Sequence, residues 1–217
     1  MAGLLAAMNG YWQRFGTDLA LHLTGTPESL SKSAAAEHAR VRHKHLVNFL
    51  GQPTDEELSK QYALAAAFVT LSRAEGFGLP VLEAMAHGCP VLAAACASLP
   101  EFVGDAGVLV DPDDVVAVAD GIHRITTDRV FRATLVEAGL GRAQRFTWEE
   151  TAFRFCELYR RVAGEAAVTG RPIRPARETR RGRPAGQPRR TRLLPPTPDQ
   201  LPLHCPPLQF SEQQSEF

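Results

Sequence analysis

Two glutamates frame a stretch of the chain whose residue types are suited to binding a polar ligand. The stretch reads EGFGLPVLEAMAHGCP over residues 75–90, with Glu75 at its start and Glu83 eight residues later. Pro80 suits the first turn of a helix, where its missing backbone N–H costs nothing and its fixed φ is already helical. We therefore expect a helix to begin near Leu79, with a glycine-containing loop directly before it.

The loop before this helix combines glycines with a helix N-terminus, an arrangement that can bind phosphate groups. Gly76 and Gly78 let the backbone approach a ligand and adopt conformations that other residues avoid, and helix N-termini carry partial positive charge. The loop follows a predicted strand that ends at Ser72, and ligands of open α/β sheets bind at the carboxyl ends of strands. Because the two carboxylates would repel phosphate, we expect them to accept hydrogen bonds from hydroxyl groups. A nucleotide diphosphate sugar offers both kinds of group.

Short apolar runs alternate with amphipathic segments up to about residue 167, which predicts regular alternation of strands and helices. The predicted strands are 19–25, 45–51, 66–72, 90–96 and 106–111, and the predicted helices are 28–42, 54–65, the helix at Pro80, 113–126, 129–145 and one from Trp148. Continuous apolar strands are typical of a parallel sheet that is covered on both faces. We therefore predict a doubly wound α/β domain over residues 1–167.

The remaining residues, 168–217, differ sharply in composition. They contain ten of the sixteen prolines of the chain, and from Thr169 onward nine arginines against four acidic residues and no lysine. Such a segment buries too little apolar surface to offset the entropy of ordering it, so we predict a disordered Arg/Pro-rich tail. Arginine-rich segments attract phosphate, but no aromatic residues are interleaved with these arginines, and no nucleic-acid partner is expected. A shifted reading frame would also explain the abrupt change in composition.

The bulk composition is that of an ordinary globular protein. Lys+Arg and Asp+Glu both number 24, and 44% of the residues are hydrophobic, enough for a packed core. The longest apolar run, 62–71, is too short to span a bilayer. The four cysteines form no CxxC pair or zinc spacing, so we expect no metal site. No secretory signal is recognisable, and the expected location is cytoplasmic, extending to a peripheral position at the inner membrane face.

At this point the sequence resembles a known family. EGFGLPVLE is similar to the E-x7-E signature of the retaining GT-B glycosyltransferases of group 1. The whole of the longer string, EGFGLPVLEAMAHGCPV followed by SLPEFVGDAGVLVDP, also resembles the corresponding segment of that family. NFLGQPTDEELSKQYALAAAFVTLS before the motif and RAQRFTWEETAFRFCELYRRV at the end are similar to family segments as well. The resemblance covers roughly residues 10 to 165.

The resemblance implies a role for each matching residue. Glu75 is the candidate catalytic residue, beside the donor sugar, and Glu83 would bind the ribose hydroxyls. The other implied donor-binding residues are Gly76, Phe77, Gly78 and Leu79 at the sugar and diphosphate, and Leu50 and Gly51 near the base. The implied substrate is a UDP- or GDP-linked sugar, which passes to an acceptor hydroxyl with retention and without a cofactor or an obligatory metal.

The resemblance also implies that parts of the GT-B fold are missing from this chain. That fold has two Rossmann-like domains, and the chain matches the second, the C-terminal donor-binding half. The sheet of that second domain has the strand order 3-2-1-4-5-6, in which the first strand is central. The match begins after this strand and after an Arg/Lys pair that binds the diphosphate. The acceptor is unknown, and a separate N-terminal acceptor domain is the expected partner. We expect the isolated chain to fold poorly, because its central strands lack a neighbour, and to have no transferase activity.

Three functions compete at this stage. The first is the donor domain of a glycosyltransferase. The second is a truncated, non-catalytic remnant that binds nucleotide or a partner chain, which the missing basic pair favours. The third is a nucleotide-linked oxidoreductase on the same type of sheet, which is disfavoured because no G-x-G-x-x-G follows any predicted strand.

Overall fold

The computed structural model describes residues 1–162 and 208–210 of the chain. The described residues belong to two compact units, one formed by Met1–Gln144 together with the strand at 208–210, and the other beginning at Arg145. The end of the predicted domain, residues 163–167, and the rest of the predicted tail, residues 168–207 and 211–217, lie outside the described residues.

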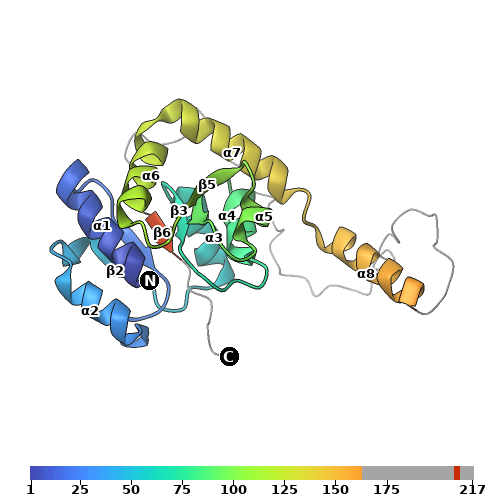
Figure 1. The fold of residues 1–217 in the computed structure, drawn as a ribbon, viewed down its shortest axis with the longest axis horizontal. Coiled ribbons are helices and arrows are strands. Elements are labelled where there is room, and N and C mark those ends of the chain that lie inside the picture. The colour runs from blue at the N-terminus through green and yellow to red at the C-terminus, as the bar shows by residue number, and fades with distance from the viewer. Residues whose placement is uncertain (163–207, 211–217) are drawn as a thin grey trace, which may run out of the picture. The chain divides into compact units, whose positions relative to one another are not determined.

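The first unit is built on a six-stranded sheet in which every pairing is parallel. Its strands are β1 Leu21–Leu23, β2 Val47–Phe49, β3 Phe68–Thr70, β4 Val91–Ala94, β5 Gly107–Val110 and β6 Leu208–Phe210. The first five fall inside the five predicted strand ranges, so the α/β prediction and the parallel sheet are confirmed (Figure 1).

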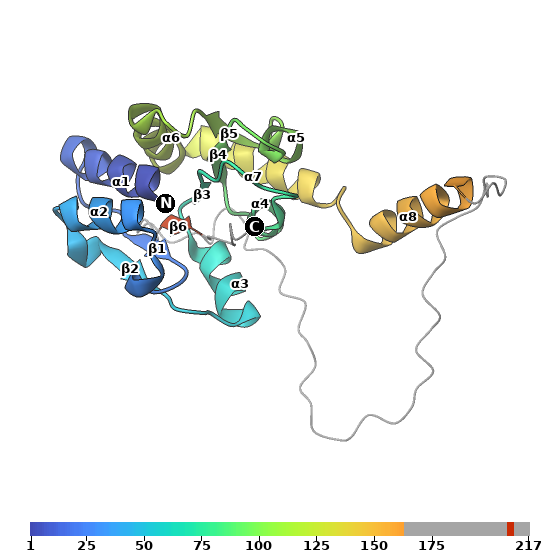
Figure 2. The ribbon, with the colours of Figure 1, turned by 60° about the horizontal axis from the view of Figure 1, so that its bottom comes forward.

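The sixth strand was not foreseen from the sequence. The strand order is β2-β1-β6-β3-β4-β5, so β6 occupies the central position between β1 and β3 (Figure 2). This is the position of the first strand in the predicted order 3-2-1-4-5-6, the strand that the chain was expected to lack. Sequence composition placed Leu208–Phe210 in a disordered tail, and the structure instead pairs their backbone on both sides. Composition misses such a strand because three residues in a polar segment carry no periodic signal.

Helices connect the strands close to the predicted positions. In the first unit they are α1 Ala2–Phe15, η1 Pro27–Ser29, α2 Lys32–Arg40, η2 Lys44–Leu46, α3 Asp55–Leu64, α4 Leu79–Ala86, α5 Leu99–Val103, α6 Val115–Thr127 and α7 Arg129–Ala143. The predicted helix 28–42 is divided because Ser31 caps α2, accepting a hydrogen bond from the backbone N–H of Ala34 at 3.3 Å. Thr54 and Glu57 form a capping box that fixes the start of α3.

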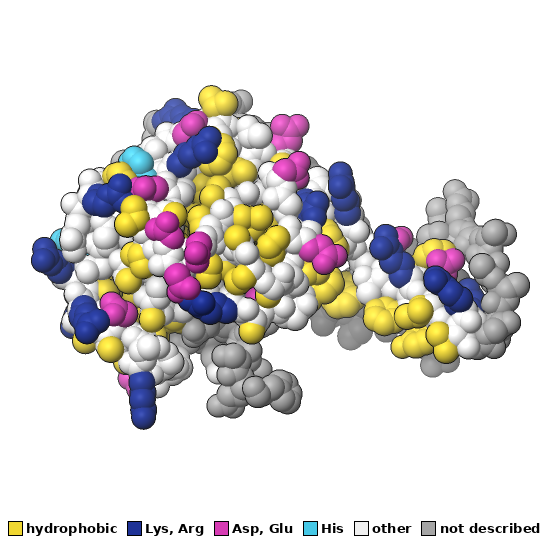
Figure 3. Space-filling view, viewed as in Figure 1, with side chains coloured by type: hydrophobic (Ala, Val, Ile, Leu, Met, Phe, Trp, Pro, Cys, Tyr) yellow, Lys and Arg dark blue, Asp and Glu magenta, His cyan; other side chains and the backbone are white. Residues whose placement is uncertain are grey.

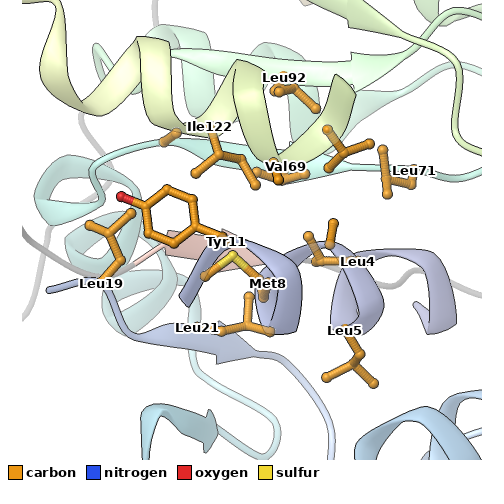
Figure 4. Packing of buried hydrophobic residues seen from close by; sticks show 14 of the residues in the cluster. Leu4, Leu5, Met8, Tyr11, Leu19, Leu21, Val69, Leu71, Leu92 and Ile122 are labelled. Atoms are coloured by element: carbon orange, nitrogen blue, oxygen red, sulfur yellow. The ribbon is translucent and has the colours of Figure 1, made fainter. Parts of the chain in front are cut away.

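Alternating residues of the strands point to opposite faces of the sheet and bury two separate cores. Val69 and Leu92 lie in a core with α1 and α6, whereas Phe68 and Val91 lie in a core with α3, α4 and α5. Figure 4 shows Met8 and Tyr11 of α1 among the residues of the first core. Helices on both faces explain why the strands read as continuous apolar runs.

The described part of the second unit is the helix α8, Trp148–Val162. Its large exposed apolar residues recur at helical spacing and gather along one side of the helix, as Figure 3 shows: Trp148, Phe155, Leu158, Tyr159 and Val162. Within the described residues, no helix has the length and apolar character needed to cross a bilayer.

The close approach of β4, β5 and α5 predicts a glycine requirement at one position of the sheet. A Cβ at Gly107 would lie 2.9 Å from the backbone O of Val91 and 2.8 Å from Cγ1 of Val103. Because the strand backbone cannot yield, Gly107→Ala should lower the free energy of unfolding by about 1–3 kcal/mol in a denaturant titration.

The matched control is Gly10→Ala in α1, where a Cβ would meet nothing within 4 Å. Alanine is a better helix former than glycine, so the free energy of unfolding of this variant should rise by about 0.5–1 kcal/mol. Equal unfolding midpoints for the two variants would contradict the packing described here.

Candidate functional site

The loop Ser72–Gly78 joins β3 to α4 at the carboxyl end of β3 (Figure 1). Two side chains from the segment after β4 hold it in place. The Ser98 hydroxyl donates a hydrogen bond to the backbone O of Glu75 at 2.9 Å, and the Cys96 thiol donates to the backbone O of Ser72 at 3.6 Å. The loop is therefore positioned by its neighbour in the sheet and does not depend on a ligand for these contacts.

Gly78 sets the geometry at the start of α4. Its φ of 77° and ψ of 36° lie in the left-handed region, and it is the N-cap of the helix, with Pro80 in the first turn. A Cβ there would lie 3.2 Å from Cδ2 of Leu99. The predicted helix start near Leu79 is confirmed, and so is the need for a glycine at 78. A Cβ at Gly76, by contrast, would meet nothing within 4 Å, so packing alone does not require this glycine.

The two glutamates have different surroundings. Glu75 lies half-buried in the loop, and Glu83 lies exposed in α4. The Tyr62 hydroxyl, from α3, donates a hydrogen bond to Oε2 of Glu83 at 3.4 Å. The backbone O of Glu83 lies 2.7 Å from Nδ1 of His87. The structure therefore links the Glu83 carboxylate to a neighbouring helix, whereas the Glu75 backbone is linked to Ser98.

Tyr62 is a site residue that sequence reasoning did not identify. Its side chain is 2% exposed, and burial, followed by the charge of Glu83, raises the pKa of its phenol above the ordinary value. The hydroxyl consequently stays protonated and acts as a donor to the carboxylate. In the sequence Tyr62 lies at the end of an amphipathic helix and reads as a core residue. Only its hydroxyl group, which contacts Glu83 of the next helix, distinguishes it from the other core residues.

Two apolar side chains lie exposed beside the loop. Phe77 is 45% exposed, and its ring centroid lies 4.5 Å from that of Phe102 in α5. Leu79 is 41% exposed at the first position of α4. Phe77 therefore packs against the protein on one side and presents its remaining surface to solvent at the predicted site.

The predicted base-binding residues Leu50 and Gly51 follow β2 and are tied to the loop after β1. The N–H of Gly25 donates to the O of Gly51 at 2.6 Å, and the N–H of Gly51 donates to the O of Gly25 at 3.0 Å. The N–H of Leu50 donates to the O of Leu23 at 2.8 Å. Because β1, β2 and β3 are parallel, these loops and the loop Ser72–Gly78 lie at the same edge of the sheet.

The basic residue of the loop forms an ion pair. Arg73, the one basic residue in the sequence between Ser72 and Gly78, forms an ion pair with Asp113, which follows β5. Both side chains are well exposed. Among the described residues, no group of three or more His, Cys, Asp or Glu side chains is placed to hold a metal ion.

The left-handed conformation at Gly78 predicts a difference between the two loop glycines. Gly78→Ala should lower the free energy of unfolding by about 1–2 kcal/mol, because an L side chain is strained at this φ. Gly76→Ala, with open space around its Cβ, should change it by no more than about 0.5 kcal/mol. Chemical denaturation of the two variants measures the difference, and a larger loss at Gly76 would contradict the assigned geometry.

The raised pKa of Tyr62 predicts a pH dependence of stability. Because the folded state holds this proton more tightly than the unfolded chain, the contribution is present below the ordinary value of 10.0 and is lost as the pH rises above it. The free energy of unfolding should therefore fall by up to about 1.4 kcal/mol per pH unit above about pH 10. Tyr62→Phe should show a shallower fall over the same range. Denaturant titrations of both proteins from about pH 9 to 11 test this prediction. An equal fall of the free energy of unfolding with pH in the parent chain and in Tyr62→Phe would contradict it.

Comparisons with known proteins show the family to which the chain is similar. The family model "Glycosyl transferases group 1" matches residues 1–128. The O-antigen chain mannosyltransferase B of Escherichia coli is 42% identical over 114 residues, which cover 52% of this chain and 30% of that protein. The matches to the first three curated relatives span between 27% and 34% of the length of those proteins.

Solved structures show the same fold. Sucrose-phosphate synthase of Thermosynechococcus elongatus superposes with a TM-score of 0.61 at 34% identity, covering 75% of this chain and 42% of that one. The C-terminal domain of a group 1 glycosyltransferase, LpcC, of Francisella tularensis superposes with a TM-score of 0.55 at 26% identity, covering 66% of this chain and 77% of that domain. The matched family model covers more than half of the residues, so the chain belongs to the group 1 glycosyltransferases, which have the GT-B fold.

Proposed function

We propose that this chain binds a nucleotide diphosphate sugar as the donor-binding part of a retaining glycosyltransferase, which passes the sugar to an acceptor hydroxyl. One observation carries the proposal. The loop after β3 places Gly78 in a left-handed conformation at the N-terminus of α4, with Glu75 in the loop and Glu83 in the helix. The E-x7-E resemblance of EGFGLPVLE supports the retaining outcome.

The diphosphate would bind at the N-terminus of α4. Backbone groups of Gly76, Phe77, Gly78 and Leu79 approach the ligand there, and the helix contributes partial positive charge. The interaction requires no metal ion, because the helix dipole and the backbone amides supply the favourable electrostatics. The exposed ring of Phe77 borders this position.

The two carboxylates would bind the hydroxyl groups of the donor. Ionised carboxylates accept hydrogen bonds and cannot donate them, which suits hydroxyls and disfavours phosphate. Glu75 would accept from the transferred sugar and is the proposed catalytic residue. Glu83 would accept from the ribose, and the Tyr62 hydroxyl orients its carboxylate from the side of α3.

The base would lie near Leu50 and Gly51, at the end of β2. The paired N–H and C=O groups of Gly25 and Gly51 hold this loop in a fixed position beside the loop after β1. Both UDP- and GDP-linked sugars are compatible with this arrangement, and the proposal includes both.

The acceptor would be bound by a second domain. This chain superposes on 77% of the structure of the C-terminal domain of LpcC. That superposition supports its assignment to the donor-binding half. The acceptor then meets the donor between this half and a separate N-terminal domain, in the cytoplasm or at the inner membrane face.

A second function is binding without transfer. The observation that favours it is the ion pair between Arg73 and Asp113, which engages the one basic side chain of the loop. Transfer needs positive charge on the leaving diphosphate, whereas ground-state binding is supported by the helix N-terminus alone. A chain of this kind would bind the donor and leave it intact.

Charge-neutral substitutions of the two glutamates test the proposed donor contacts. Glu83→Gln and Glu75→Gln should each weaken binding of UDP-glucose or GDP-mannose about tenfold or more, because a hydrogen bond to a charged group is worth about 1.5–3 kcal/mol. Thermal-shift titration of the full chain measures the affinity, since a ligand of the folded state raises Tm by an amount that grows with the logarithm of 1 + [L]/Kd.

The matched control is Glu137→Gln, an exposed acid on α7 that removes the same charge and should leave the affinity unchanged. Equal affinity in all four proteins would refute the roles of Glu75 and Glu83. Release of free nucleotide diphosphate in the presence of sugar acceptors separates the two functions. Binding without release favours the non-catalytic function.

A further inference from the structure

The central strand position separates the sheet into two parts. On one side β1 pairs with β2, on the other β3 pairs with β4 and β4 with β5, and β6 pairs with both β1 and β3. Within the described residues, β6 is thus the strand that joins the two parts into one sheet. We call the position between β1 and β3 the central slot (Figure 2).

The two strands that border the central slot, β1 and β3, pack into the same hydrophobic core. Leu21 and Leu23 of β1 belong to the same buried cluster as Val69 of β3 and Leu92 of β4, together with residues of α1 and α6. Because β1 and β3 are two positions apart in the sheet, their separation is about 10 Å, twice the spacing of neighbouring strands. A gap of this width accepts one extended strand.

The two walls of the central slot, β1 and β3, require a hydrogen-bonding partner for their backbone groups. The side chains of Leu21, Leu23, Phe68 and Val69 are all 0% exposed, so the strands that carry them lie in the interior. Buried backbone N–H and C=O groups are almost always paired. Neither wall carries a proline or a charged residue that would discourage pairing.

The occupant matches the wall in residue type. The register pairs Leu21 with Leu208, His22 with Gln209 and Leu23 with Phe210, so apolar residues pair with apolar ones and the polar residue with the polar one. Gln209 is also paired with Phe68 on the opposite wall. A slip of one residue would break this match on the β1 side.

The length of the chain allows the occupant to come from the same molecule. A parallel connection needs about a dozen residues or more, and the sequence supplies residues 163–207 between α8 and β6. This connection is long enough for the strand to come from the same molecule.

We propose that the central slot is a strand-accepting site and that the chain's own segment Leu208–Phe210 occupies it, completing the sheet within one molecule. The site binds a short extended segment through backbone pairing on both sides, in parallel orientation. A synthetic peptide with the sequence of residues 204–214 is then a ligand of the same slot whenever the internal strand is displaced.

Gln209→Pro in the full chain tests the proposal, because proline removes a backbone N–H at the residue paired with both walls. Hydrogen-exchange mass spectrometry should show about tenfold or faster exchange in fragments that contain β1 and β3. Addition of the 204–214 peptide should restore their protection. Gln187→Pro is the matched control and should exchange as the parent chain does, and a peptide carrying the same Gln209→Pro change should restore nothing.

The parent chain provides a measurement that does not depend on the variant folding. Its amides at 209 and 210 should be protected, and light scattering should show a monomer. Exchange of these amides at the rate of an unstructured peptide would overturn the proposal. A dimer whose protection is lost on dilution would overturn its intramolecular part, since the strand would then come from a second copy. Protection of β1 and β3 that is unchanged in a folded Gln209→Pro chain would also overturn it.

Discussion

The structure depends on backbone pairing at the centre of a buried parallel sheet. Because helices cover both faces, β1 and β3 are largely buried, and their backbone groups need a strand between them. The sequence up to residue 167 supplies five strands and leaves this position open. Three residues near the C-terminus take it, and the result is one continuous sheet in place of two separate parts.

The same sheet positions the candidate site. Parallel strands direct their carboxyl ends to one edge, so the loops after β1, β2 and β3 share that edge although they are far apart in the sequence. Neighbouring segments then fix each loop: Ser98 holds the loop with Glu75, and Gly25 holds the loop with Gly51. The candidate site is therefore an assembly of separately anchored loops, and their relative positions depend on the continuity of the sheet beneath them.

Membership of the group 1 glycosyltransferases rests on the family match and on the fold. The proposed roles of individual residues rest on local physics. The conformation of Gly78 excludes other residues, the N-terminus of α4 favours phosphate, and carboxylates favour hydroxyls. Tyr62 adds a constraint of its own, because a buried phenol that stays protonated can hold the Glu83 carboxylate in one orientation. These elements suit a ligand that carries both phosphates and hydroxyl groups.

The sequence by itself determined the local elements. Apolar runs marked five strands, Pro80 and Thr54 marked helix starts, and the glycine at 78 was assigned for the conformation that it adopts. Tertiary structure alone decided three things: the strand Leu208–Phe210, the contact of Tyr62 with Glu83, and the pairing of Gly25 with Gly51. Each joins segments distant in the chain, and local periodicity carries no information about such pairs. They form because polar groups that lose contact with water on folding must find partners wherever the fold brings them together.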